Sequence, residues 1–221
     1  MLRISLALLT TTALSFALPA VAEVQLSLYG GANTNFDSEV KTDKGTVHDK
    51  RTVSWDGKSF EMPPYWGARA TYWFDKNQPW GVALDYTHQK AYADINFGSD
   101  PVYNHLEFTD GNNLLTVNAM YRFQQPKSDW SYYVGGGPGV AIPSFEVTLD
   151  AYPQNATHEY QITGFAAQAL AGVQYRLTDH IAAFGETKLS YTQIDGDIKG
   201  GGTVKTDIWS PHLLAGLAYS F

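Results

Sequence analysis

The feature that most constrains this chain is an alternation of apolar and smaller side chains with a period of two. It is clearest in the stretch Ile208–Phe221, where every second residue from Trp209 onward is apolar or aromatic. Because successive side chains of a strand point to opposite faces, this pattern predicts a strand with one face against an apolar medium. Such a strand needs partner strands upstream.

Seven further stretches show the same alternation, and together with the last they predict eight strands. These stretches are Val24–Asn33, Tyr65–Phe74, Trp80–Tyr92, Leu106–Phe123, Trp130–Ile142, Tyr160–Leu177 and His180–Thr192. The chain also carries 14 Tyr, 11 Phe and 6 Trp beside 20 Gly, which is typical of alternating strands with aromatic ends.

The connections between these stretches alternate between long and short. The expected long loops cover Thr34–Pro64, Ala93–His105, Pro143–Glu159 and Ile194–Thr203, and the expected short turns are Asp75–Pro79, Gln124–Asp129 and Thr178-Asp179. This plan predicts an all-β fold, an eight-stranded antiparallel up-and-down transmembrane β-barrel in the outer membrane with both termini periplasmic. A soluble lipocalin-like barrel has the same strand count, but the polar residues here are too sparse to coat an exterior. The ending on Phe221 resembles the terminal strand that barrel-assembly machinery recognises, so we expect that machinery as a partner.

The first 22 residues have the pattern of a secretory signal. Arg3 precedes an apolar run, and Ala20-Val21-Ala22 fits a cleavage site, so we expect a signal peptide at 1–22 and one barrel domain at 23–221. The chain has no cysteine, so its fold must be stable without disulfides. Because its formal net charge is −7, we do not expect a nucleic-acid partner. We expect a monomer.

Eight strands leave an interior that side chains fill, so the inward positions should form a packed polar core and no pore. The expected inward set is Arg69, Asp85, Arg122, Gln168, Gln174, Glu186, Lys188 and His212. Opposite charges are available within this set for pairing. Aromatic residues beside the loops and turns predict two girdles, one with Tyr65, Trp66, Tyr92, Tyr191 and Trp209, and one with Trp73, Trp80, Tyr121, Phe123, Trp130, Tyr175, Tyr219 and Phe221.

Candidate chemistry gathers at the long-loop rim, where the stretch His105–Gly111 enters its strand. His105, Glu107 and Asp110 are candidate catalytic residues, and His88 on the adjacent strand, with His105 and Glu107, is a candidate divalent-metal ligand set. Alternation places Asp110 on the face opposite to His105 and Glu107 unless a bulge intervenes. Solvation of a loop explains the same residues without chemistry.

The first long loop offers a second set of polar residues. Lys50, Arg51 and Lys58 are candidate contacts to lipid phosphates. The alternative location for the rim site is the set His48, Asp56 and Glu61 in this loop.

Four segments resemble the alphaproteobacterial lipid A oxidases, a family of small outer-membrane barrels. They are VQLSLYGG at Val24–Gly31, WDGKSFEMPPYW at Trp55–Trp66, LEFTDG at Leu106–Gly111 and the region Tyr160–Gly172. The resemblance implies an enzyme that uses O2 to oxidise the proximal glucosamine of lipid A, in lipopolysaccharide, to 2-aminogluconate, releasing hydrogen peroxide and depending on a divalent cation. No nicotinamide or flavin motif is present, so a loop-bound metal is the simplest device for using oxygen.

Two other classes of function remain open from the sequence. A non-enzymatic structural or adhesive barrel needs only the core and the loops. A lipid A deacylase needs a Ser and a His paired on the lipid-facing wall, and neither Gly-x-Ser-x-Gly nor His-x-Ser occurs in the chain.

Overall fold

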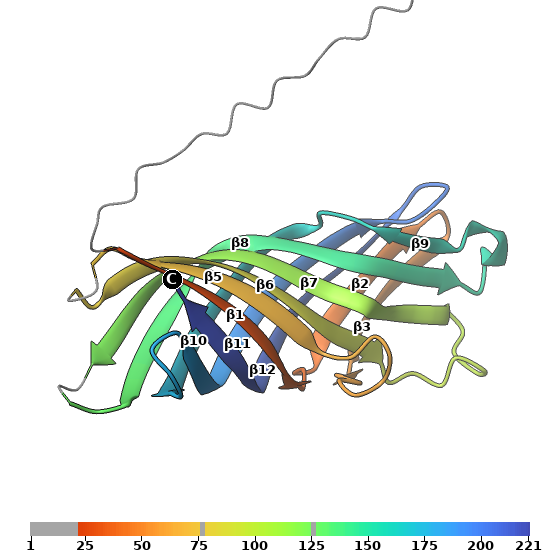
Figure 1. Ribbon diagram of the computed structural model, residues 1–221. Coiled ribbons are helices and arrows are strands. Elements are labelled where there is room, and N and C mark those ends of the chain that lie inside the picture. Colours follow the sequence, from red (N-terminus) through yellow and green to blue (C-terminus); the bar gives the residue numbers. More distant parts are fainter. Residues whose placement is uncertain (1–21, 76–77, 125–126) are drawn as a thin grey trace, which may run out of the picture.

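The protein folds as a closed antiparallel barrel with a long extension at one end (Figure 1). The computed structural model describes residues 22–75, 78–124 and 127–221, so the expected signal peptide lies almost wholly outside the described residues. The barrel strands are β1 (Glu23–Asn33), β5 (Trp66–Trp73), β6 (Trp80–Ala93), β7 (Tyr103–Gln124), β8 (Trp130–Leu149), β10 (Gly164–Arg176), β11 (Ile181–Asp197) and β12 (Thr203–Ser220). Each pairs with the next, and β1 closes the ring on β12.

All eight predicted strands are present, and their up-and-down order is confirmed. The short turns gather at one end of the barrel, which we call the turn end, together with the starts of β1 and the end of β12 (Figure 1). The main-chain N–H of Phe221 donates to Val24 at 3.0 Å, so the last residue is tied to the first strand. We call the opposite end the loop end.

Four buried charges cross the centre of the barrel and define its ion layer: Arg69, Asp85, Glu186 and Lys188. The Arg69 guanidinium donates to both Glu186 oxygens at 2.7 Å and to Asp85 Oδ2 at 2.9 Å. Lys188 Nζ lies 3.1 Å from the same Asp85 oxygen. Two cations thus balance two anions, as buried charges require.

Polar neighbours complete the ion layer and fill the barrel around it. The Tyr29 hydroxyl donates to Asp85 at 2.6 Å, the Tyr133 hydroxyl to Glu186 at 2.8 Å, and the Gln168 amide to Asp85 at 2.8 Å. The prediction of a packed polar core is therefore confirmed at the centre. The other predicted inward residues are also inward, since Arg122 and His212 are buried and Gln174 lines the cavity at the turn end.

The outer face carries the predicted apolar belt, with two corrections. Most of the expected girdle residues, such as Trp66, Trp80 and Trp209, are well exposed on the outer face. Trp73 instead points inward, where its ring lies 4.4 Å from the Arg122 guanidinium. Tyr65 is also inward, 5.5 Å from the His212 ring. The neighbours Phe74 and Trp66 take the outward positions instead. Proximity to a turn therefore did not determine whether an aromatic side chain faces outward.

Strands extend into every predicted long loop and fill about half of their residues, which is the main correction to the fold. The first contains the hairpin of β2 (Ser38–Lys44) and β3 (Val47–Val53) and the short β4 (Trp55–Asp56), while β9 (Thr157–Tyr160) lies on β8 after the 3-10 turn η1 (Pro153–Asn155). The strands β7, β8, β11 and β12 continue past their predicted ends. Together these segments form the extension at the loop end (Figure 1).

The extension is built like a soluble barrel, because its interior is apolar and its exterior polar. Its core is formed by buried residues from β2, β3, β4, β6, β7, β8, β11 and β12, including Phe108 and Phe145, with ring centroids 5.6 Å apart. On β11 the inward residues change from Lys188 and Thr192 to Ile194, and Ile198 directly after the strand is also buried. The alternation therefore inverts its polarity where the strands leave the apolar belt.

The short strand β5 leaves a gap in the wall between β1 and β6, and the segment 57–65 fills it. The Asn33 main-chain N–H donates to Ser59 Oγ at 2.9 Å, and the Tyr65 N–H donates to the Ser59 carbonyl at 2.8 Å. The main-chain carbonyl of Lys90 on β6 accepts hydrogen bonds from the side-chain amides of Asn33 and Asn35, each at 3.0 Å. Within the described ranges, no helix is long and apolar enough to cross a bilayer.

Candidate functional site

The candidate site lies on the outer face of the extension, where His105 and Glu107 of β7 are side by side. Alternation places both on the same face, and His105 Nε2 lies 2.8 Å from Glu107 Oε1. Glu146 of β8 stands directly opposite Glu107 in the β7–β8 register. His105 Nε2 is 3.9 Å from Glu146 Oε2, so one imidazole lies between two carboxylates.

A bulge brings Asp110 onto this face. Pro143 of β8 has no N–H to donate, and the facing stretch of β7 between Glu107 and Asn112 makes no ladder pairs with β8. Gly111 adopts a φ of 128°, a conformation that side chains other than glycine rarely tolerate. The extra residues shift the phase of the strand, and Asp110 joins the side of Glu146.

His158 of β9 completes the arrangement, because β9 pairs it with Glu146. Its Nδ1 lies 3.3 Å from Glu146 Oε2, and its Nε2 lies 3.5 Å from Asp110 Oδ2. The Tyr160 hydroxyl fixes the bulge by donating to the Asp110 carbonyl at 2.7 Å. We call the five residues His105, Glu107, Asp110, Glu146 and His158 the wall cluster.

The charges of the wall cluster are mutually dependent. The neighbouring Glu146 carboxylate, and with it Glu107, raises the pKa of His105 against the opposing effect of burial. Burial acts against ionisation of Glu146, but the two histidines outweigh it and lower the pKa of that carboxyl. Like charges directly opposite in a sheet are destabilising, so Glu107 and Glu146 need a cation between them. Protonated His105 is one such cation, and a metal ion is another.

The donor atoms of the wall cluster suit a divalent metal. His105, Glu107 and Glu146 form one set, and Asp110, Glu146 and His158 form another, with ligand atoms within 4.8 Å of one another in each. Imidazole nitrogen with carboxylate oxygen is a donor combination that binds iron, manganese and zinc with positions left open. Glu146 belongs to both sets, and only 8% of its surface is exposed. The residues present therefore fit a divalent cation.

The structure places the predicted site residues unequally. It brings His105, Glu107 and Asp110 together, but His88 belongs to neither ligand set among the described residues. The His88 ring stacks on Trp66, and its Nδ1 lies 2.8 Å from Asn113 Oδ1. Sequence reasoning missed Glu146 and His158, because both lie in what was expected to be a long loop.

The predicted phosphate contacts are separated. Lys50 pairs with Glu39, and Arg51 makes ion pairs with Asp49 and Asp100, all in the outer part of the extension. Lys58 lies lower, with Nζ 3.5 Å from the Tyr92 ring.

The alternative set in the first loop does not assemble. His48 Nδ1 pairs with Asp43 at 3.4 Å, and Asp56 caps the main chain of Lys58. Within the part of the chain that the structure describes, His48, Asp56 and Glu61 form no three-ligand group.

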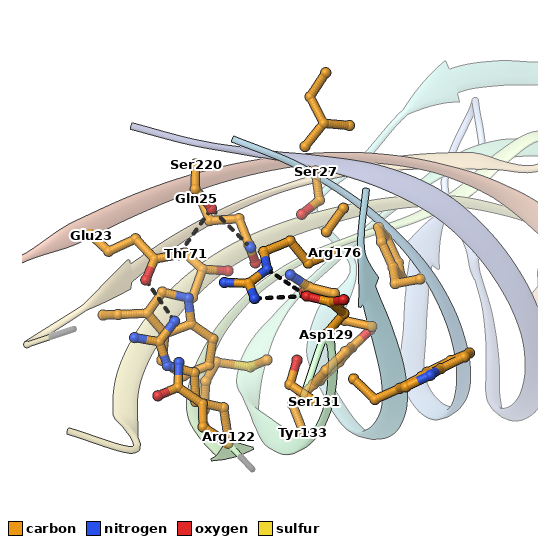
Figure 2. A pocket seen from close by; sticks show the side chains of 18 of the residues that line it. Glu23, Gln25, Ser27, Thr71, Arg122, Asp129, Ser131, Tyr133, Arg176 and Ser220 are labelled. Atoms are coloured by element: carbon orange, nitrogen blue, oxygen red, sulfur yellow. Dashed lines mark hydrogen bonds and ion pairs between the residues drawn. The ribbon is translucent and has the colours of Figure 1, made fainter. Parts of the chain in front are cut away.

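A cavity of about 870 Å³ opens inside the barrel at the turn end (Figure 2). Glu23 and Arg122 face each other in it at 2.7 Å, and Gln25 donates to Ser220 at 3.2 Å. Arg69 of the ion layer lines the cavity. Among the described residues, the cavity walls carry no group of three side chains that could hold a metal ion. The wall cluster is therefore the stronger candidate.

Comparison with known proteins agrees with this architecture. A family model described as "Outer membrane protein beta-barrel domain" matches residues 4–221. Neisserial surface protein A (NspA) is similar in structure, with a TM-score of 0.50 and 17% identity over 90% of this chain and 97% of that one. The N-terminal β-barrel domain of Pseudomonas aeruginosa OprF has a TM-score of 0.46 and 16% identity, covering 90% and 97%. Ail of Yersinia pestis has 0.42 and 17%, covering 91% and 99%. No curated protein matches the sequence.

Proposed function

The chain belongs to the outer-membrane protein β-barrel domain family, and we propose that it is a divalent-metal-dependent enzyme that oxidises lipid A with O2. The proposal places the loop end outside the cell, with the termini and the turn end in the periplasm. It also assigns the β12 end, with Phe221, to barrel-assembly machinery. Its support is the wall cluster together with the resemblance of four sequence segments to lipid A oxidases.

The observation that carries the proposal is the height of the wall cluster. Glu146 lies four residues beyond the outward position of Ile142 on β8, which is about 13 Å along a strand and about 10 Å along the membrane normal after tilt. The headgroup layer is roughly 5 to 8 Å thick on each side of the hydrocarbon core. Taking Ile142 as the last residue of the apolar belt puts the cluster at the outer edge of the headgroups, about level with a lipid sugar.

The chemistry requires a free hydroxyl at C1 of the proximal glucosamine. That hemiacetal carbon loses two electrons and two protons to O2, which leaves as hydrogen peroxide, and the resulting lactone takes up one water to give the acid. Asp110, the cluster carboxylate outside the set His105, Glu107 and Glu146, accepts the hydroxyl proton. His105, Glu107 and Glu146 would hold the metal, which supplies the route for electron transfer to O2.

Mass spectrometry of lipid A tests the proposal in cells. Lipid A from cells with the protein should contain a species heavier by one oxygen atom, and His105→Ala and Glu107→Ala should abolish it while the barrel still assembles. His180→Ala is the matched control, because His180 lies at the turn end against the Ser220 carbonyl. Full oxidation by both cluster variants would contradict the proposal.

A second candidate is a structural or adhesive surface barrel without catalysis. The balanced ion layer and the apolar core of the extension favour it, because they make a stable platform and no channel. Lipid A of unchanged mass in the presence of an assembled, metal-loaded barrel would favour this function. Loss of an acyl chain would instead indicate a deacylase.

A further inference from the structure

Lys90 of β6 is a buried cation that makes no ion pair among the described residues, although the carboxylates of Glu61, Asp110 and Glu107 act on it from farther away. Only 2% of its surface is exposed, and Gln89 and Ala91 on either side of it point into the barrel, so its side chain lies on the outer wall. Among the described residues its ammonium has one hydrogen-bond partner, the Glu61 carbonyl at 3.0 Å, and no carboxylate within ion-pair distance. A buried charge of this kind requires a counter-ion.

The segment that covers Lys90 has an apolar tip. Phe60 and Met62 are each 85% exposed, although the loop is anchored on both sides by the buried residues Ser59 and Tyr65. Large apolar side chains held this far out on a fixed loop mark a surface that contacts lipid or another partner. The loop directly precedes Trp66, whose ring packs on Tyr86 at 5.3 Å in the girdle. The tip is therefore continuous with the lipid-facing belt.

A second cation stands beside this loop. Lys58 Nζ lies 3.5 Å from the Tyr92 ring and 3.7 Å from Glu61 Oε2, and about a quarter of its side chain is exposed. Lys90 sits four residues above the girdle residue Tyr86, about 13 Å along the strand. The two ammonium groups are thus at the height of lipid phosphates, with the apolar tip next to them.

We propose that the loop Gly57–Pro64 inserts Phe60 and Met62 among the acyl chains of the leaflet at the loop end, and that Lys90 and Lys58 bind the phosphate of an anionic lipid there. Lys58, about a quarter exposed, is the cation whose charged end can reach the headgroups directly, and Lys90 lies beneath the loop beside it. Lys90 lies near Asp110 and Glu107 of the wall cluster, but lipid binding at this site does not require oxidation there. Its test reads lipid binding, so that its failure is separate from a failure of the oxidation.

Native mass spectrometry of the full chain released from micelles that contain a phosphate-bearing lipid tests the phosphate site. The wild type should retain one such lipid, and Lys90→Met, which keeps the length of the side chain, should lower the retained fraction at least fivefold. Lys205→Met is the matched control, because Lys205 pairs with Asp195 on the exposed extension. Equal retention by wild type and Lys90→Met would overturn the proposal.

Nitroxide depth measurements test the tip without relying on the Lys90 variant. The chain has no cysteine, so Phe60→Cys gives a single labelling site. In bilayers the label should collide more with oxygen than with a water-soluble nickel complex, as a label at Val82→Cys in the apolar belt should. A label at Lys205→Cys should show the reverse. A label at position 60 that behaves like the one at 205 would overturn the inserted loop.

Discussion

Glu146 links the two halves of the wall cluster at the scale of single residues. It stands opposite Glu107 on one side and opposite His158 on the other, so each of its neighbours depends on its charge. Without a metal, the imidazoles supply the compensating positive charge. With a metal, Glu146 is the ligand common to both sets.

The metal-free protein should show this dependence in the titration of His105. Because Glu146 and Glu107 raise its folded pKa above the ordinary 6.5, the stabilisation from protonated His105 is complete below about pH 6.5 and is lost as pH rises through the folded value. NMR titration in chelator should give a pKa above 6.5 for His105, and Glu146→Gln should lower it. A value unchanged by that substitution would mean that the two groups do not interact.

Metal binding should depend on Glu146 more than on any neighbouring carboxylate. Glu146→Gln keeps the size of the side chain but removes the shared ligand charge, so we expect divalent-metal affinity to fall by at least about tenfold in calorimetric titrations. Glu159→Gln on β9 makes the same charge change outside both ligand sets and should bind normally. Equal affinities for the two variants would contradict the assigned ligands.

The inversion of polarity along the strands organises the molecule at the scale of elements. Alternation predicted the strands within the apolar belt, since Leu84 out and Asp85 in is a pattern that no loop requires. It placed the end of the strand too early, because beyond Ile142 the apolar residues lie on the inward face and Pro143 suggests a strand end. The bulge at Gly111 was raised only as an alternative, and cross-strand register was not readable. Glu146 and His158 could have been found by following the alternation through its inversion.

Phe145 tests whether the apolar core holds the extension together. It is fully buried between Phe108 and its neighbours, so Phe145→Ala should destabilise the extension by about 3 to 5 kcal/mol and leave the membrane barrel assembled. Hydrogen exchange should show lost protection in β2, β3 and β9 and in the outer parts of β7, β8, β11 and β12, with the barrel below them unchanged. Phe36→Ala removes an exposed ring from the same end and should change little. Unchanged protection in Phe145→Ala would show that the extension is held by its strand ladders.

The ion layer secures the barrel at the scale of the whole molecule. Arg69 of β5 and Glu186 of β11 come from strands three places apart around the ring. Their predicted inward positions followed from alternation alone. Their pairing could not be predicted, because it depends on the barrel's closure and register. The up-and-down order could also be predicted from the sequence, because a tight turn can join two strands only as antiparallel neighbours.

Arg69→Ala and Glu186→Ala should each lower the free energy of unfolding by about 3 kcal/mol, because each leaves a buried charge without its partner. The double variant should lose less than the sum, since Asp85 and Lys188 remain paired. Urea unfolding followed by the gel shift between folded and boiled barrel measures all three. Additive losses would mean that Arg69 and Glu186 do not compensate each other.

The most direct test of the central claim is oxygen consumption by the purified, metal-loaded barrel reconstituted with lipid A whose C1 hydroxyl is free. We expect one hydrogen peroxide to be released for each lipid that gains an oxygen atom from water, with no turnover under nitrogen or in Glu107→Ala. A folded barrel that binds metal and lipid A, yet consumes no oxygen and leaves the lipid mass unchanged, would contradict it.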